Sequence, residues 1–343
     1  MKNYIVFDLE WNQSARGKED SIEDFPFEII EIGAVKLDEQ FHMVDEFHRL
    51  IRPQVYTQMH YMISEVTHMD MGELQDHGEG FVTAMDAFIR WCGDGAVYCT
   101  WGSMDLTELQ RNLVYHRMEN PFPKPLFYYD VQKLFGLFYA DDRRVSLDAA
   151  VEQMGLIEDR PFHRALDDAY YTGRVLAQMD RTQIEPYVSL DYYRLPENKD
   201  EEIHLVFPNY SKYVSRIFPD KEEAMEDKTV TEMKCYCCRR TLRKKVRWFT
   251  PNQKIYYGLA ICPEHGYLKG KIRIKKVDDV RVYVVKTLKL TDEEGAMKIM
   301  ERKDDVRKKR SERNKAKKQR ARELMKKVRT KNTGAASKRQ TGI

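Results

Sequence analysis

Four acidic residues and one histidine in the first half of the chain have the types that a metal-dependent reaction needs. They are Asp8, Glu10, Asp105, His163 and Asp168. Carboxylate oxygens suit Mg²⁺ or Mn²⁺, and a histidine can take a proton from water near neutral pH. Two bound ions can hold both the attacking and the leaving oxygen of a phosphoryl transfer. The set predicts a two-metal phosphodiesterase site that uses Mg²⁺ or Mn²⁺ and has its own general base.

The first two carboxylates follow the first predicted strand. Residues 3–8 form a short apolar run that ends in a charged residue, which is typical of a buried strand. Asp8 and Glu10 are two positions apart, so their side chains point to the same face of that strand. They lie at its carboxyl end, where mixed α/β sheets commonly place their ligands.

The other three residues lie where predicted helices begin. Asp105 opens a helix directly after a strand expected over residues 96–100. Asp168 falls in the first turn of a helix expected over residues 164–179, and His163 precedes that helix in its entry loop. The sequence therefore predicts a site built from strand ends and helix starts.

The elements around these residues predict a mixed α/β fold. Three strands, over residues 3–8, 27–37 and 41–51, are joined by short links and indicate an antiparallel meander. Gly33, inside the second strand, could mark a bulge. Helices and strands then alternate in the order βββαβαβα, which predicts a mixed β-sheet with helices packed on it.

Three sequence segments resemble the motifs of the DEDDh branch of the DnaQ-like 3′–5′ exonucleases, which share an RNase H-like fold. The segments are FDLEW at Asp8, WGSMDLTEL at Asp105 and HRALDDA at His163. FEIIEIGAV and the Trp101-Gly102 pair also resemble the branch that trims RNA 3′ ends, which includes the sporulation-inhibitor-like and histone-RNA exonucleases. The resemblance covers residues 1–183 and is specific as a set.

The resemblance implies hydrolysis of the terminal phosphodiester of single-stranded nucleic acid, with release of nucleoside 5′-monophosphates. Asp8, Glu10 and Asp168 would hold one metal ion, and Asp8 with Asp105, directly or through water, would hold the second. His163 would deprotonate the attacking water. RNA is the favoured substrate and single-stranded DNA is the alternative.

Further residues of this first region could contact the nucleic acid. Trp11, and either Met62 or Thr67, could pack against the terminal base or sugar, although core packing is an equal possibility for Met62. Arg164 could contact a phosphate. Where the relatives often read Leu-Thr-Gly-Ile near the terminal nucleotide, this chain reads VTHM from residue 66 on.

Charge is divided unevenly along the chain. Residues 1–230 carry 23 Lys and Arg against 43 Asp and Glu, whereas residues 231–343 carry 35 against 12. An acidic body followed by a basic third predicts a catalytic domain joined to a nucleic-acid-binding region. The expected parts are an exonuclease domain over 1–183, a connecting segment over 184–230, a zinc-ribbon-like domain over 231–290, and a basic helical tail over 291–343 whose last ten residues are disordered.

Two short-spaced pairs of metal-binding residues lie in the basic third. Cys235 and Cys238 form the first pair, and Cys262 and His265 form the second. Thiolates and imidazole in this pattern suit one closed, tetrahedral Zn²⁺ site. Strands expected over residues 242–249, 254–261 and 271–276 complete a layout that resembles a zinc ribbon. Cys237 could replace Cys235 or Cys238, or be a spare thiol.

Basic residues follow the first cysteine pair and fill the tail. Arg243, Lys245 and Arg247 could contact phosphates, and aromatic residues lie close to them. Residues 301–343 carry 18 Lys and Arg against 5 Asp and Glu, which favours a polyanionic partner. The expected partner is single-stranded nucleic acid, with structured RNA or the ribosome held by the basic third.

Composition argues against membrane and secreted classes. No apolar run approaches the ~18 residues of a membrane span, and a strand that begins at residue 3 leaves no room for a signal peptide. The cysteine spacings do not resemble a disulfide framework. We therefore expect a cytoplasmic protein with no membrane partner. A different class, an RNA- or ribosome-binding protein that uses a nuclease fold as a module, would tolerate the loss of a site residue, yet all five are present.

Overall fold

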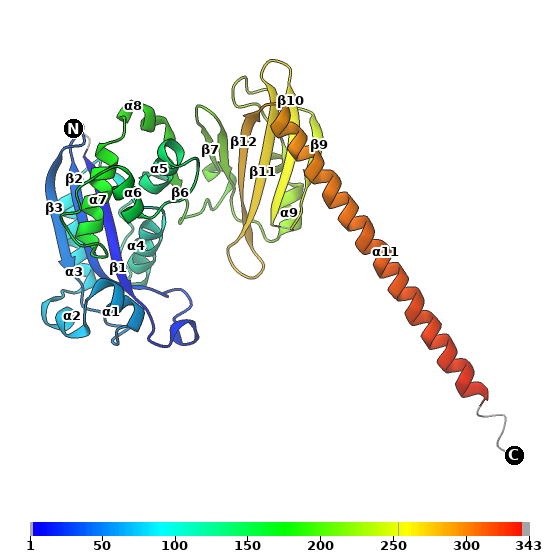
Figure 1. Cartoon of the computed structure of the whole chain (residues 1–343), viewed down its shortest axis with the longest axis horizontal. Coiled ribbons are helices and arrows are strands. Elements are labelled where there is room, and N and C mark those ends of the chain that lie inside the picture. The colour runs from blue at the N-terminus through cyan, green and yellow to red at the C-terminus, as the bar shows by residue number, and fades with distance from the viewer. Residues whose placement is uncertain (1–2, 253, 338–343) are drawn as a thin grey trace. The chain divides into compact units, whose positions relative to one another are not determined.

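The chain folds into two compact units that divide between Arg194 and Leu195 (Figure 1). The computed structural model describes residues 3–252 and 254–337, and their side chains except those of residues 18 and 321–337. The division lies inside the segment 184–230 that the sequence predicted as a connection. Part of that segment belongs to the sheet of the first unit and part to the sheet of the second. Its strands have only three or four residues, too few for an alternating pattern to stand out.

The first unit contains a six-stranded mixed sheet in the order β3-β2-β1-β4-β5-β6. Its strands are β1 (Tyr4–Asn12), β2 (Glu28–Leu37), β3 (Met43–Leu50), β4 (Val97–Thr100), β5 (Leu126–Asp130) and β6 (Ser189–Asp191). The first three strands form the predicted antiparallel meander. β1 and β4, and β4 and β5, pair in parallel, while β6 adds an antiparallel edge that the sequence did not predict. The mixed α/β fold is confirmed.

Helices cover both faces of this sheet. They are α1 (Tyr61–Thr67), α2 (Met71–His77), α3 (Phe81–Cys92), α4 (Met104–Tyr115), α5 (Val131–Tyr139), α6 (Leu147–Gln153), α7 (Ala165–Ala177) and α8 (Arg181–Ile184). Alternate residues of β1 point to opposite faces. Phe7 packs in one apolar cluster with Phe88 of α3 and Leu109 of α4, whereas Val6 packs in the other with Tyr171 of α7. The even-numbered face of β1 is therefore the face that α7 covers.

Gly33 is where α7 crosses the sheet, and the predicted bulge at this residue is wrong. The pairing of β1 with β2 is regular at Asp8 and Gly33, and its irregularity falls between Glu10 and Trp11. A Cβ atom at position 33 would lie 2.0 Å from the backbone nitrogen of Leu166. The missing side chain thus lets the first turn of α7 rest directly on the backbone of β2.

The second unit contains a six-stranded sheet in the order β7-β8-β12-β11-β10-β9, antiparallel throughout. Its strands are β7 (Ile203–Val206), β8 (Ser211–Val214), β9 (Lys244–Phe249), β10 (Ile255–Cys262), β11 (Gly266–Lys276) and β12 (Val282–Thr291). Two short helices, α9 (Lys221–Glu226) and α10 (Lys228–Thr231), lie between β8 and β9 in the sequence. The three predicted strands correspond to β9, β10 and part of β11. The sheet is therefore twice as wide as the predicted one.

A long helix, α11 (Glu293–Ser337), follows the second sheet. Its first turns pack on the sheet, because Ala296 is buried with Val246 and Leu259, and Ile299 and Met300 pack against them. The tail is helical through Ser337, so residues 334–337, which the sequence predicted as disordered, belong to the helix, and the rest of that prediction, from residue 338 on, lies outside the described residues. None of the helices in the described ranges has the length and apolar character that crossing a bilayer requires.

Candidate active site

Three of the predicted carboxylates lie together at one end of the first sheet. One ligand oxygen from each of Asp8, Glu10 and Asp168 lies within 4.8 Å of the other two. Asp8 and Glu10 continue the face of β1 that begins with Val6, and α7, which packs Tyr171 on that face, supplies Asp168 from its first turn. Strand alternation and the position of one helix therefore bring residues 160 positions apart into one acidic cluster.

Asp105 borders this cluster from the start of α4. Asp105 is only 5% exposed, and the backbone N–H of Leu9 donates a hydrogen bond to its carboxylate. That bond ties α4 to β1 between the two carboxylates of the strand. After burial, the charge of Asp105 is the largest influence that raises the pKa of Asp8.

Burial and mutual repulsion keep these carboxyl groups from ionising together. Burial is the largest cause in each case, and neighbouring carboxylates add to it. The pKa of Asp8 lies well above its usual value. The pKa of Glu10 rises to about 9, that of Asp105 to about 7 and that of Asp168 to about 6. A divalent cation would relieve this repulsion, so the residues present fit a metal site.

The raised pKa values predict how the stability of the metal-free protein depends on pH. In the unfolded chain these groups ionise near pH 4, whereas in the fold Asp168, Asp105 and Glu10 ionise at about 6, 7 and 9. The unfolded state therefore binds fewer protons than the folded state, and stability falls as pH rises through this range. We expect the Tm without added divalent ions to fall by several degrees, about 3–6 °C, between pH 6 and pH 9.

Thermal unfolding with and without Mn²⁺ measures this effect. Mn²⁺ should raise the Tm more at pH 8.5 than at pH 6, because metal binding competes with protons. The double variant Asp8→Asn with Asp168→Asn serves as the matched control, and its Tm should depend less on both pH and Mn²⁺. A Tm of the unmodified protein that is level from pH 6 to pH 9 would contradict the assignment.

His163 occupies the loop that leads into α7. Its backbone has a φ of 68°, in the left-handed region, and its N–H donates to Oδ1 of Asp168 at 3.2 Å. The residue is exposed, so solvent reaches the ring. The hydrogen bond holds the loop beside the acidic cluster, as a proton acceptor for an attacking water requires.

Glu31 is a residue of the site that sequence reasoning missed. Its side chain is 1% exposed and pairs with Arg164, whose Nη2 lies 2.8 Å from Oε1. The same carboxylate accepts the N–H of Ala165 at 3.1 Å and lies 2.6 Å from Nε2 of His48. Burial alone would raise the pKa of Glu31, but the hydrogen bonds from His48 and Arg164 lower it overall. A charged residue inside the apolar run FEIIEIGAV was the available signal.

The sequence predicted that Arg164 contacts a phosphate, whereas in the structure its guanidinium pairs with Glu31. Three hydrogen bonds join its guanidinium to Glu31, directly opposite Glu10 in the pairing of β1 with β2. Because Ala165 also donates to Glu31, the carboxylate caps the start of α7 and fixes it on β2. The side chain of Arg164 remains 30% exposed, and its predicted phosphate contact stays a prediction.

The residues that the sequence predicted to contact the terminal base or sugar lie near the end of β1. Two of the three make contacts within the protein instead. The Trp11 ring packs on Phe27, with centroids 5.6 Å apart. Thr67 is 2% exposed, and its hydroxyl donates to the carbonyl of Ile63 at 2.8 Å. Met62, in contrast, is 53% exposed, so it does not belong to the core.

Asn12, also missed from the sequence, connects α1 with β1. Its side-chain nitrogen donates to the carbonyls of Tyr56 and Gln58 at 2.9 Å, and its oxygen accepts the N–H of His60 at 3.0 Å. Asn12 lies two positions after Glu10 on the same strand. The segment that leads into α1 is therefore held against the strand that carries the acidic cluster.

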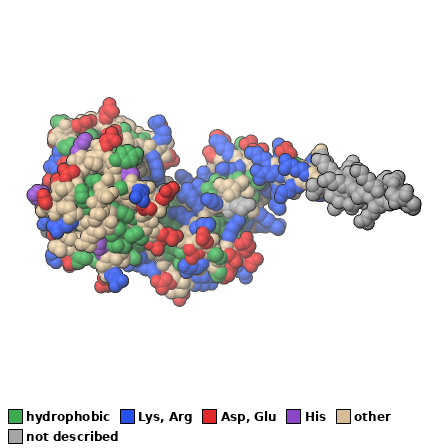
Figure 2. Space-filling model, turned by 90° about the horizontal axis from the view of Figure 1, so that it is seen from below, with side chains coloured by type: hydrophobic (Ala, Val, Ile, Leu, Met, Phe, Trp, Pro, Cys, Tyr) green, Lys and Arg blue, Asp and Glu red, His purple; other side chains and the backbone are tan. Residues whose placement is uncertain are grey.

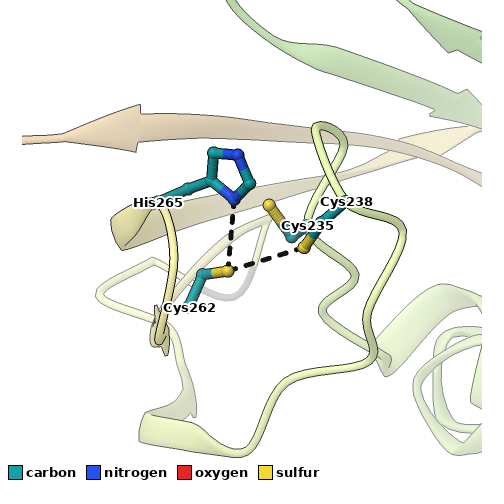
Figure 3. A group of neighbouring side chains, drawn as sticks. All are labelled: Cys235, Cys238, Cys262 and His265. Carbon is teal, nitrogen blue, oxygen red and sulfur yellow. Dashed lines mark hydrogen bonds between the residues drawn. The ribbon is translucent and has the colours of Figure 1, made fainter.

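Three cysteines and a histidine form a second cluster, in the second unit (Figure 3). One ligand atom from each of Cys235, Cys238, Cys262 and His265 lies within 4.8 Å of the others. The Sγ of Cys262 is 3.6 Å from that of Cys238 and 3.5 Å from Nδ1 of His265. Cys237 is exposed and outside the group. The structure thus gathers the four predicted zinc ligands and leaves out the ambiguous thiol.

The turn between β10 and β11 favours the thiolate of Cys262. Burial raises the pKa of this thiol, but hydrogen bonds from the ring of His265 and from the backbone N–H groups of Glu264 and His265 lower it to about 6. The thiolate is the form that binds a metal.

Comparison with known proteins assigns the first unit to a family. The Exonuclease family (RNase_T) matches residues 5–176, half of the chain, and the protein belongs to this family. All five predicted residues of the acidic site fall within the matched range. The first unit is accordingly a DEDDh-type exonuclease domain, and the family supports a 3′–5′ exonuclease activity.

Several known exonucleases are similar to this chain. A probable 3′–5′ exonuclease, KapD of Bacillus subtilis (strain 168), is 26% identical over 189 residues, which cover 53% of this chain and 87% of the relative. The nuclease domain of 3′hExo, a DEDDh family member solved with bound rAMP, is 21% identical with a TM-score of 0.45, and the match covers 55% of this chain and 96% of that one. E. coli exonuclease I is 12% identical with a TM-score of 0.45, with coverage of 76% and 54%.

Proposed function

We propose that this protein is a two-metal 3′–5′ exoribonuclease of the branch that trims RNA 3′ ends, and that it releases nucleoside 5′-monophosphates from single-stranded RNA. The observation that carries the proposal is the cluster of Asp8, Glu10 and Asp168, whose ligand atoms lie within 4.8 Å of one another. The charge of Asp105 acts on the same cluster, and His163 is tied to it by a hydrogen bond.

The acidic residues would hold two Mg²⁺ or Mn²⁺ ions. Asp8, Glu10 and Asp168 would hold the first, and Asp8 with Asp105, directly or through water, would hold the second. When bound, such a pair of ions stabilises the attacking and leaving oxygens of the phosphodiester. The same charge would offset the acidity of the first unit, which otherwise repels a polyanion.

His163 would accept the proton of the attacking water. A general base of this kind must come within hydrogen-bond reach of that water. The exposed residue and the hydrogen bond from its backbone to Asp168 support this role. Trp11 and Arg164, which are partly exposed, would contribute to holding the RNA end, whereas the buried Thr67 would not contact it directly.

The second unit would hold structured RNA or the ribosome. Cys235, Cys238, Cys262 and His265 would bind one structural Zn²⁺ in a zinc-ribbon-like arrangement. Arg243, Lys245 and Arg247 are exposed on β9 and at its start, where they would contact phosphates. A cytoplasmic location remains part of the same proposal.

A side-by-side degradation assay tests the function. Single-stranded RNA and DNA of the same sequence, labelled at the 5′ end, are incubated with the full chain with and without Mg²⁺. We expect Mg²⁺-dependent shortening from the 3′ end, at least tenfold faster on RNA. Faster shortening of DNA would favour the single-stranded DNA exonuclease. Tight binding of RNA with no shortening of either strand would favour a binding protein built on the nuclease fold.

A further inference from the structure

One face of helix α11 changes from apolar to cationic as the helix leaves the sheet. Residues three and four positions apart share a face of an α-helix. The face in question carries Ala296, Ile299, Lys303, Val306, Arg310, Arg313 and Lys317. Ala296 is 1% exposed and Ile299 packs beside it on the sheet. Lys303 begins the cationic part of the face, and the helix continues beyond the strands (Figure 1).

The cations of this helix are concentrated on one side. Within residues 301–320, the face opposite to that of Arg310 and Arg313 carries Lys308 and Lys315 together with Asp304 and Glu312. Positive charges there are offset by two acidic neighbours, whereas Asp305 is the one acidic residue that lines the cavity on the sheet-facing side. A helix that only needed to stay solvated would not require this separation. Figure 2 shows Lys and Arg side chains gathered over the described part of the helix.

Two open cavities lie where this face meets the sheet, and together we call them the β9–α11 groove. The first, of about 970 Å³, is lined by Arg243, Lys244, Lys245, Arg247 and Lys303, and no acidic residue is among its described lining residues. The second, of about 510 Å³, is lined by Arg302, Lys309, Arg310 and Arg313, with Asp305 as its acidic member. Strand β9 and Lys303 line the first cavity, whereas Thr250 and Pro251, which follow β9, and the next turns of α11 line the second, so the two cavities follow one another along the chain.

The groove fits a phosphodiester backbone better than a base or a bilayer. Trp248 lines it, but its Nε1 donates to the carbonyl of Thr231 at 2.7 Å and its ring packs against Gly258 and Gly270, so it serves the core. Val306 is the only large apolar residue of the helix face after Lys303 among residues 303–320. An amphipathic helix that enters a membrane needs more apolar anchors than this. Closely spaced Lys and Arg instead match the regular charges of a nucleic acid strand.

We propose that the β9–α11 groove binds the phosphate backbone of an RNA strand independently of the active site. This inference deepens the proposed function and rests on it for the choice of RNA as the polyanion. It adds Lys303, Lys309, Arg310 and Arg313 of α11 to the contacts expected from β9. The first exposed turns of α11 therefore bind the RNA backbone with one face, and the opposite face of the helix does not contact the RNA.

Two double variants of the same helix test the groove. Lys303→Gln with Lys309→Gln removes one cation from each cavity. Lys308→Gln with Lys315→Gln makes the same chemical change on the opposite face. Both are prepared in the full chain carrying Asp8→Asn, and binding of a fluorescein-labelled 20-nucleotide single-stranded RNA is followed by anisotropy from 50 to 300 mM KCl without added Mg²⁺. Circular dichroism checks that helix content is unchanged.

We expect the groove pair to weaken RNA binding about tenfold at 0.1 M salt and to reduce the slope of log K against log salt by about 1.4, since each phosphate contact on a single strand contributes about 0.7. The control pair should stay within twofold. Equal losses in both pairs, or no loss in either, would overturn the proposal, as would binding to phosphatidylserine vesicles that depends on the groove pair while RNA binding does not. Because binding is measured in an inactive protein, failure of the nuclease proposal would leave this result readable.

Discussion

Replacement of Asp8 by asparagine should abolish the Mg²⁺-dependent release of mononucleotides, with a loss of roughly 10³-fold or more in kcat. Asp8 lies in the cluster with Glu10 and Asp168, and the charge of Asp105 raises its pKa. It is therefore the residue that both proposed ions would share. The amide keeps the shape of the side chain and removes the charge, so the loss reports metal binding and not packing.

The measurement is single-turnover hydrolysis of a 5′-labelled RNA, with Mn²⁺-induced stabilisation as a second readout. His163→Ala should also lose about 10²- to 10⁴-fold in rate but keep the stabilisation by Mn²⁺, because its ring is not a proposed ligand. Asp86→Asn, an exposed position on α3, is the matched control and should change neither. Activity retained by either site variant would refute the assignment of that residue.

Disruption of the cluster of three cysteines and a histidine, the proposed zinc site, should have the second-largest effect, on the stability of the second unit. Cys262 ends β10 and its Sγ lies beside both Cys238 and His265. The small core around it includes Cys235 and Leu268, so a metal would join the segment before β9 to the β10–β11 turn. Cys262→Ser should abolish the bound zinc and lower the Tm of this unit by roughly 10 °C or more.

Metal analysis and thermal unfolding of the full chain measure this outcome. Cys237→Ser is the control, because Cys237 is exposed and lies outside the cluster. That variant should keep one equivalent of zinc and an unchanged Tm. Zinc that remains in Cys262→Ser, or that is absent from the unmodified protein, would show that the cluster is not a zinc site.

Local patterns in the sequence predicted most of the first unit and the residues of its acidic cluster. A two-residue spacing places Asp8 and Glu10 on one face of a strand, and a helix start places Asp168, so each position follows from nearby residues alone. A charge inside an apolar strand marks Glu31 as unusual, but its role in the site could not be found in this way. Its partners Arg164 and Ala165 are 133 and 134 positions away, and no local period records such a contact.

The second sheet shows a different limit of sequence reasoning. β12 was missed because Lys286 interrupts its apolar run. In the structure Lys286 is buried, and its Nζ donates to the carbonyls of Thr229 and Glu232 at the end of α10. Burial lowers its pKa to about 8. Carbonyl acceptors from a distant segment thus make a charged residue acceptable inside a strand, and the sequence of the strand does not contain them.

The contact at Gly33 sets a limit on how this protein can change over time. The two halves of the acidic cluster come from β1 and α7, and α7 rests on the neighbouring strand β2 at Gly33, opposite Asp8, where a side chain is missing. A methyl group at position 33 would act as a wedge under Leu166. It would lift the start of α7 and carry Asp168 away from Asp8 while every ligand remained in the sequence. Substitution of this one glycine during evolution would therefore inactivate the exonuclease site, although all of its sequence motifs would remain complete.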